Sequence, residues 1–252
     1  MALTPRPPEA SARAEAAALE AAYGALDPRE IIVFAMNQFW SGELAVVSSF
    51  GADSAVLLHM ISEFDRDLPV LFLDTGKHFE ETHDYRDALI DDLGLNDLRI
   101  VTPIETVLER DDPTGLLHRR DTEGCCAIRK VEPMQRAVKP FRAWFTGRKR
   151  FQAATREKMP VFEAVGPRIR INPLASWGPD EIAAYMDEHG LRQNPLVAYG
   201  YLSIGCFPCT EPVQAGSDPR SGRWSGQAKT ECGIHLPGAL GETQAETSRA
   251  QN

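Results

Sequence analysis

Short apolar runs that alternate with helical segments are the feature that most constrains the fold of this chain. Residues 44–47, 69–73 and 98–101 have the composition of buried strands, and apolar residues at helical spacing separate them over 53–64 and 79–93. Strands that alternate with helices form parallel sheets with right-handed crossovers. We therefore expect an α/β fold with a doubly wound, mostly parallel sheet and an irregular C-terminal tail. Further helices are expected over 28–41, 125–138 and 179–188, and further strands over 143–146 and 168–171.

The two ends of the chain differ in composition from this alternating region. Residues 1–25 are rich in Pro and Ala, and residues 214–230 are rich in Gly, Ser and Arg. We expect a flexible N-terminal segment over 1–25, one α/β domain over 26–212 and a mobile C-terminal segment over 213–252.

Hydropathy and cysteine usage predict a cytoplasmic protein. The sequence has no run of about 18 apolar residues, the length that a membrane span needs, and its start lacks the apolar stretch of a secretory signal. Five cysteines, an odd number with two of them adjacent, are not typical of a secreted disulfide framework. We expect a reducing compartment and no membrane partner.

Charge is unevenly distributed along the chain. The net charge of −9 argues against general nucleic-acid binding. Residues 127–170 nevertheless hold 12 Lys and Arg and only three acids. That segment is either a solvated basic surface or part of an anion site within an acidic protein.

A loop of small residues follows the first predicted strand and precedes a helix. It runs from Ser48 to Ser54, where a doubly wound sheet binds its ligands. Backbone N–H groups, serine hydroxyls and the helix N-terminus there can receive an anion. The fingerprints GxGxxG and GxxxxGK[ST] are both missing, so the loop supports neither Rossmann dinucleotide binding nor P-loop chemistry. A plain turn with Asp53 and Ser54 as helix caps is the alternative.

Four of the five cysteines form two tight pairs, Cys125 with Cys126 and Cys206 with Cys209. Adjacent cysteines on a helix point about 100° apart, which suits a multi-atom cluster better than one tetrahedral ion. An iron–sulfur cluster, a zinc ion, and separate redox or structural thiols all remain open at this point.

The fifth cysteine, Cys232, stands alone near the C-terminus. It is either an incidental exposed thiol or a nucleophile whose pKa Lys229 and His235 could lower. If the other four cysteines bind a metal centre, no second free thiol is left to form a disulfide with Cys232. Anything bound covalently to Cys232 would then need an outside thiol for its removal.

The loop and the end of the second strand resemble a known family. Residues 49–54, SFGADS, are similar to the PP-loop SGGxDS of adenine-nucleotide α-hydrolase folds, in the SxFGA[DE] variant of the sulfonucleotide reductases. Residues 73–82 resemble that family's LDTGxxFxET segment, whose backbone receives the adenine. The resemblance implies nucleotide contacts from both segments, through Ser48, Ser49, Phe50, Gly51, Ser54, Leu73 and Thr75.

The cysteines lie in motifs that resemble those of the assimilatory adenylyl-sulfate reductases. Residues 125–133 are similar to CCxxRKxxP, residues 201–210 to YxSIGCxPCT, and residues 229–235 to KxECG[LI]H. The first two motifs imply a [4Fe–4S] cluster held by Cys125, Cys126, Cys206 and Cys209. The third implies that Cys232 is the catalytic nucleophile.

Two basic elements complete the resemblance. Residues 220–224 are similar to the family's RxGRW, and residues 146–156 to TGxRxxQSxTR. Phe151 and Ala153 depart from the Asp and Ser that are common in the second element, which affects the expected shape of the sulfate pocket. The cations expected to bind the substrate and to stabilise the leaving phosphate are Lys130, Arg148, Arg156, Arg220 and Arg223.

The resemblance implies a thioredoxin-dependent reductase in sulfate assimilation and cysteine biosynthesis. It would convert adenosine 5′-phosphosulfate to sulfite and AMP through an S-sulfonate on Cys232, with thioredoxin or a glutaredoxin-like protein as thiol donor. The alternatives are a reductase of the 3′-phosphorylated nucleotide or of both nucleotides, an iron–sulfur PP-loop tRNA sulfurtransferase, and a non-catalytic metal-stabilised binding module. The sequence does not indicate an oligomeric state.

Overall fold

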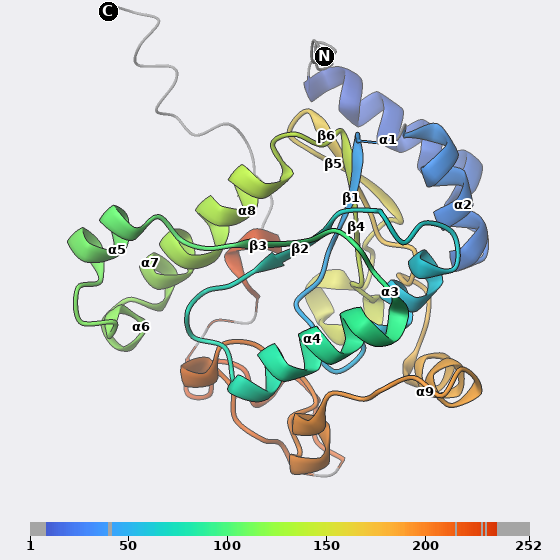
Figure 1. Ribbon diagram of the computed structural model, residues 1–252. Coiled ribbons are helices and arrows are strands. Elements are labelled where there is room, and N and C mark those ends of the chain that lie inside the picture. The colour runs from blue at the N-terminus through green and yellow to red at the C-terminus, as the bar shows by residue number, and fades with distance from the viewer. Residues whose placement is uncertain (1–8, 40–41, 215, 228, 230, 236–252) are drawn as a thin grey trace, which may run out of the picture.

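A six-stranded sheet forms the centre of the molecule (Figure 1). The computed structural model describes residues 9–39, 42–214, 216–227, 229 and 231–235. The strand order is β3-β2-β1-β4-β6-β5, and all neighbours pair in parallel except β5 and β6. The strands are β1 (Leu44–Val47), β2 (Val70–Leu73), β3 (Leu98–Val101), β4 (Ala143–Thr146), β5 (Phe162–Val165) and β6 (Arg168–Ile171).

Helices cover both faces of the sheet, as the alternating pattern predicts. Side chains of a strand point to opposite faces in turn. Leu44 and Val46 of β1 accordingly pack into the larger core with helices α2, α3, α4 and α9, whereas Ala45 packs with α8. The doubly wound, mostly parallel fold is therefore confirmed. These helices are α2 (Pro28–Gln38), α3 (Ser54–Ser62), α4 (Glu80–Leu93), α8 (Glu132–Val138) and α9 (Pro179–Glu188).

The N-terminal segment differs from the expectation of a flexible segment over 1–25. Residues Glu9–Tyr23 form helix α1, which packs against β5 and β6. Ala12, Ala16 and Leu19 are buried, since their spacing places them on one helical face and small alanines allow close approach. The Glu20 carboxylate also accepts a 2.9 Å hydrogen bond from the Phe162 amide. The part of the prediction over 1–8 lies outside the described residues.

The region between β3 and β4 is more divided than the single predicted helix over 125–138. Two short helices, α5 (Glu105–Asp111) and α6 (Leu117–Arg120), precede the predicted range, and a third, α7 (Thr122–Cys126), overlaps its start. A π-helical turn, Ala127–Val131, then joins α7 to α8. Such turns widen the helix and often occur at functional sites. Among the described residues, no helix is long and apolar enough to cross a membrane.

Candidate active site

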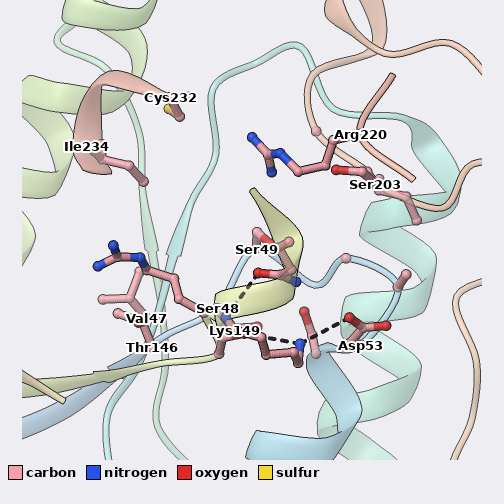
Figure 2. Close-up of a pocket in the computed structure, with 18 of the residues that line it drawn as sticks. Val47, Ser48, Ser49, Asp53, Thr146, Lys149, Ser203, Arg220, Cys232 and Ile234 are labelled. Atoms are coloured by element: carbon pink, nitrogen blue, oxygen red, sulfur yellow. Dashed lines mark hydrogen bonds and ion pairs between the residues drawn. The ribbon is translucent and has the colours of Figure 1, made fainter. Parts of the chain in front are cut away.

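A cavity of about 250 Å³ opens at the carboxyl ends of β1 and β4. The loop after β1 forms one wall and the turn after β4 another (Figure 2). The C-terminal segment closes a third side with Arg220, Cys232 and Ile234. The predicted residues that line this cavity are Ser48, Ser49, Gly51, Ser54, Lys130, Arg148, Arg156, Arg220, Arg223 and Cys232.

Phe50 anchors the loop from beneath and does not line the cavity. Its side chain is fully buried and meets Phe72 edge-to-face at 5.5 Å. Its φ of +49° is in the left-handed region, which is uncommon outside glycine. Two hydrogen bonds hold this conformation, because the Phe50 amide donates to Ser48 Oγ at 3.2 Å and Asn194 Nδ2 donates to the Phe50 carbonyl at 3.0 Å.

Asp53 does not cap α3 with its side chain. Its carboxylate instead accepts a 3.0 Å hydrogen bond from Lys149 Nζ, which also donates to the Gly147 carbonyl at 3.1 Å (Figure 2). Burial lowers the pKa of Lys149, and Asp53 opposes that effect. We did not predict Lys149 as a site residue. The signal was available, since Lys149 occupies the Arg position of the TGxRxxQSxTR element.

Leu73 and Thr75 lie away from the cavity wall. The Leu73 carbonyl accepts a 2.9 Å hydrogen bond from His78 Nε2, and the Leu73 side chain packs with α8. The Thr75 hydroxyl lies 3.4 Å from Cys206 Sγ, and its carbonyl accepts from Arg129 at 2.8 Å. The structure therefore places Thr75 beside the paired cysteines and not in the cavity at the ends of β1 and β4.

The four paired cysteines line one small cavity beside the larger one. Cys125 and Cys126 end α7, and the π-helical turn that follows carries Arg129 and Lys130. No group of three or more His, Cys, Asp or Glu among the described residues is arranged to hold a single metal ion. Iron–sulfur clusters are held by four cysteine thiolates, and the four thiols here line one cavity. The side chains present fit such a group.

The predicted arginines are paired with carboxylates or stacked on an aromatic ring. Arg148 pairs with Glu163, which also pairs with Arg170. Burial is the main effect that lowers the pKa of Arg148, to about 10. Farther along the chain, the guanidinium of Arg223 lies 4.4 Å from the centre of the Trp224 ring. The cavity is thus basic, with its positive charge held in place by buried partners.

Cys232 is buried at 7% exposure, so it is not the incidental exposed thiol that was one of the two alternatives for this residue. A hydrogen bond from the Cys126 thiol lowers the pKa of Cys232 well below its ordinary value, with further lowering by Lys130, the Ile234 amide and Arg223, against the effect of burial. The predicted neighbour Lys229 pairs with Glu123 instead. The side chain of His235 and residues 236–252 lie outside the described residues.

Glu231 and Trp224 are site residues that sequence reasoning missed. Both line the cavity. Both belong to the motifs KxECG[LI]H and RxGRW, so their positions in those motifs were the available signal.

Comparison with known proteins agrees with the fold and the motifs. Residues 43–212 match the family described as phosphoadenosine phosphosulfate reductase domain. The chain is 67% identical over 225 residues to an adenosine 5′-phosphosulfate reductase of Mesorhizobium japonicum, covering 89% of each chain. It is 61% identical over 246 residues to a protein of the same name from Chelativorans sp., covering 97% of this chain and 100% of that one. A crystal structure of phosphoadenylyl-sulfate reductase from Candida auris, in a phosphate complex, superposes with a TM-score of 0.66 at 29% identity, covering 79% of this chain and 96% of that one.

Proposed function

The chain belongs to the phosphoadenosine phosphosulfate reductase family, and on that premise we propose that it reduces adenosine 5′-phosphosulfate to sulfite and AMP in sulfate assimilation. One observation carries the proposal. The lone thiol, Cys232, is buried at the nucleotide cavity beside Lys130 and Arg223. Cations beside a thiol favour its thiolate, which is the nucleophilic form.

The loop from Ser48 to Ser54 would bind the nucleotide through its backbone N–H groups and hydroxyls, at the start of α3. Arg148, Arg156, Arg220 and Arg223 would offset the charge of the phosphosulfate group. The Cys232 thiolate attacks the sulfate sulfur, the bond from sulfur to the phosphate oxygen breaks, and AMP leaves. The product on the protein is a cysteine S-sulfonate.

Release of sulfite requires a dithiol from outside. One thiolate of thioredoxin, or of a glutaredoxin-like donor, attacks the Cys232 sulfur and expels sulfite, which leaves a mixed disulfide. The second thiol of the donor resolves that disulfide and restores Cys232, so two electrons come from the donor. Since Cys232 is 7% exposed, the tail has to move away from the cavity before the donor can reach it.

Cys125, Cys126, Cys206 and Cys209 would hold a [4Fe–4S] cluster as thiolates. Cys126 would then no longer donate to Cys232, and Lys130 and Arg223 would be the groups that favour the Cys232 thiolate. When bound, the cluster would supply structure and electrostatic stabilisation beside Lys130, whereas the covalent route carries the electrons through sulfur. Lys130 lines both the small cavity of the four paired cysteines and the larger cavity of Cys232. Although burial disfavours its charge, Cys206 and Cys232 raise the pKa of Lys130 above its ordinary value and keep the ammonium protonated.

The intact mass of the protein after mixing with adenosine 5′-phosphosulfate, without reductant, tests the mechanism. The native chain should gain one sulfonate on Cys232, and the Cys232→Ser variant should gain none. A Cys232→Ser variant that still gained the sulfonate would contradict the proposal. Appearance of sulfite only after thioredoxin is added would support the outside donor.

The 3′-phosphorylated nucleotide is the second candidate substrate. The Candida auris structure, which is 29% identical in sequence, is named as a phosphoadenylyl-sulfate reductase. Single-turnover sulfonation of Cys232 with each nucleotide in turn compares the two candidates directly. We expect adenosine 5′-phosphosulfate to react faster, and equal rates would indicate a dual-substrate enzyme.

A further inference from the structure

The residue that immediately precedes the proposed nucleophile is itself held in the cavity wall. Glu231 is 6% exposed, and its carboxylate accepts hydrogen bonds from Arg156 Nε at 2.6 Å and Arg156 Nη2 at 2.9 Å. Thr155 Oγ1 donates to it at 3.2 Å and Arg220 Nη2 at 3.3 Å. Four donors from two segments therefore converge on one carboxylate next to Cys232.

A second attachment lies on the other side of Cys232. Arg170 Nη1, on β6, donates a 3.3 Å hydrogen bond to the Ile234 carbonyl. Gly233, between them, lies so close to the π-helical turn that an added Cβ would be 2.9 Å from Val131 Cγ2. Cys232 is thus fixed between two arginine contacts, with a glycine that lets the backbone approach the wall.

Burial makes the Arg156–Glu231 ion pair costly to break and dependent on the charge of both partners. Bidentate arginine–carboxylate pairs fix direction as well as distance. Removing one partner of a buried pair leaves an uncompensated charge, which is far more costly than losing an exposed pair. The Arg156 side chain is 6% exposed and that of Glu231 is 5% exposed. The closed position of the tail therefore depends on the negative charge at residue 231.

We propose that Glu231 is a positioning residue, whose carboxylate draws the C-terminal segment onto Arg156 and Arg220 and so seats the Cys232 sulfur in the cavity. The inference rests on the proposed function for its purpose, since it assigns Glu231 to the sulfonation step. The contacts themselves do not depend on which nucleotide reacts. Without the carboxylate, the tail should spend more time away from the cavity and Cys232 should be more exposed.

The rate at which iodoacetamide alkylates Cys232 without substrate measures that exposure. Tryptic cleavage after Lys229 and Arg249 yields a peptide whose single cysteine is Cys232, so mass spectrometry follows this thiol alone. Glu231→Gln keeps the size of the side chain and removes its charge, and Glu231→Asp keeps the charge. The matched control is Asp92→Asn, which breaks a bidentate pair with Arg192 whose side chains are 41% and 50% exposed.

We expect Glu231→Gln to raise the alkylation rate roughly 10- to 100-fold, the range expected for loss of a charged hydrogen-bonded contact. The rate of single-turnover sulfonation at saturating nucleotide should fall by a similar factor. Glu231→Asp should lie between native and Gln, and Asp92→Asn should match the native chain.

An unchanged alkylation rate in Glu231→Gln would overturn the proposal. So would sulfonation that proceeds at the native rate with a lower KM, because Glu231 would then be a competitor of the substrate anion. Failure of the native chain to form any sulfonate would instead refute the proposed function and leave the alkylation result valid.

Discussion

Lys149 Nζ donates a 3.0 Å hydrogen bond to Asp53 Oδ2 and so joins the turn after β4 to the N-cap residue of α3, across 96 residues of sequence. The Lys149 side chain is 2% exposed and that of Asp53 is 30% exposed. Two walls of the cavity at the ends of β1 and β4 are therefore linked by one ion pair, whose cation is buried and whose anion is partly exposed.

Replacing Asp53 by Asn should lower the free energy of unfolding by about 3–5 kcal/mol, because Lys149 would keep its charge in a buried place without a partner. Lys149→Met removes the buried charge itself and should cost less. The double variant should recover part of the loss seen in Asp53→Asn. Urea unfolding of the four proteins checks this. Strictly additive losses would show that the pair is not coupled.

Acid should destabilise the protein through His78. Burial lowers the pKa of His78 from 6.5 to about 4, and its Nε2–H donates to the Leu73 carbonyl. Between these two pH values the unfolded chain binds a proton that the folded chain does not. The free energy of unfolding therefore falls as the pH falls from about 6.5 to about 4, by about 3 kcal/mol in total for this group.

His78→Gln should remove that part of the pH dependence while retaining a donor for the Leu73 carbonyl. Urea unfolding at pH 7.5 and pH 5 compares the native and variant chains. The native chain should lose more stability than the variant between the two pH values. Equal losses would assign the acid sensitivity to other groups.

The strands next to the site were predictable because their residues are buried on both faces. Val70–Leu73 and Ala143–Thr146 are fully buried, so they read as continuous apolar runs in the sequence. Strand β5 was missed because Glu163 interrupts its apolar run. The Glu163 side chain is only 19% exposed because Arg148 and Arg170 pair with it. In β5, ion pairs with residues of other segments stabilise a strand that the local hydrophobic pattern does not predict.

The contacts that hold the tail against the cavity could not be predicted from the sequence either. Its composition is polar and rich in glycine, which is typical of mobile segments. The partners that hold it, Arg156 and Arg170, lie more than 60 residues earlier in the chain. The motifs indicated that Cys232 would react, but the sequence spacing did not reveal which side chains bury it.

Lys130→Met should slow sulfonation of Cys232 about 100-fold, within the range for removal of one preorganised electrostatic contact. The ammonium lies beside Cys206 and Cys232, and methionine keeps the length of the side chain without its charge. Lys130→Arg should retain more activity than Met. Single-turnover sulfonation measures the effect, and a native rate in Lys130→Met would show that the charge plays no part in the step.

Glu163 holds two arginines that have separate tasks. Its Oε1 accepts from Arg148, which lines the cavity, and from Arg170, which donates to the Ile234 carbonyl of the tail. The side chains of the two arginines are 9% and 7% exposed. Loss of the carboxylate should therefore weaken the fold, the anion site and the tail contact together.

Glu163→Gln should lower the free energy of unfolding by about 3–5 kcal/mol at pH 7, because two buried cations lose their shared partner. Burial raises the pKa of Glu163, but Arg170 and Arg148 outweigh it and lower the pKa below 4.5. The stabilisation is therefore fully present above pH 4.5 and is lost progressively as the pH falls through the folded-state value, so the difference between the native and Gln chains should begin to narrow at pH 4. Urea unfolding at pH 7 and pH 4 tests both statements, with Glu163→Asp as the variant that keeps the charge. If the Gln and native chains had equal stability at pH 7, neither arginine would depend on this carboxylate.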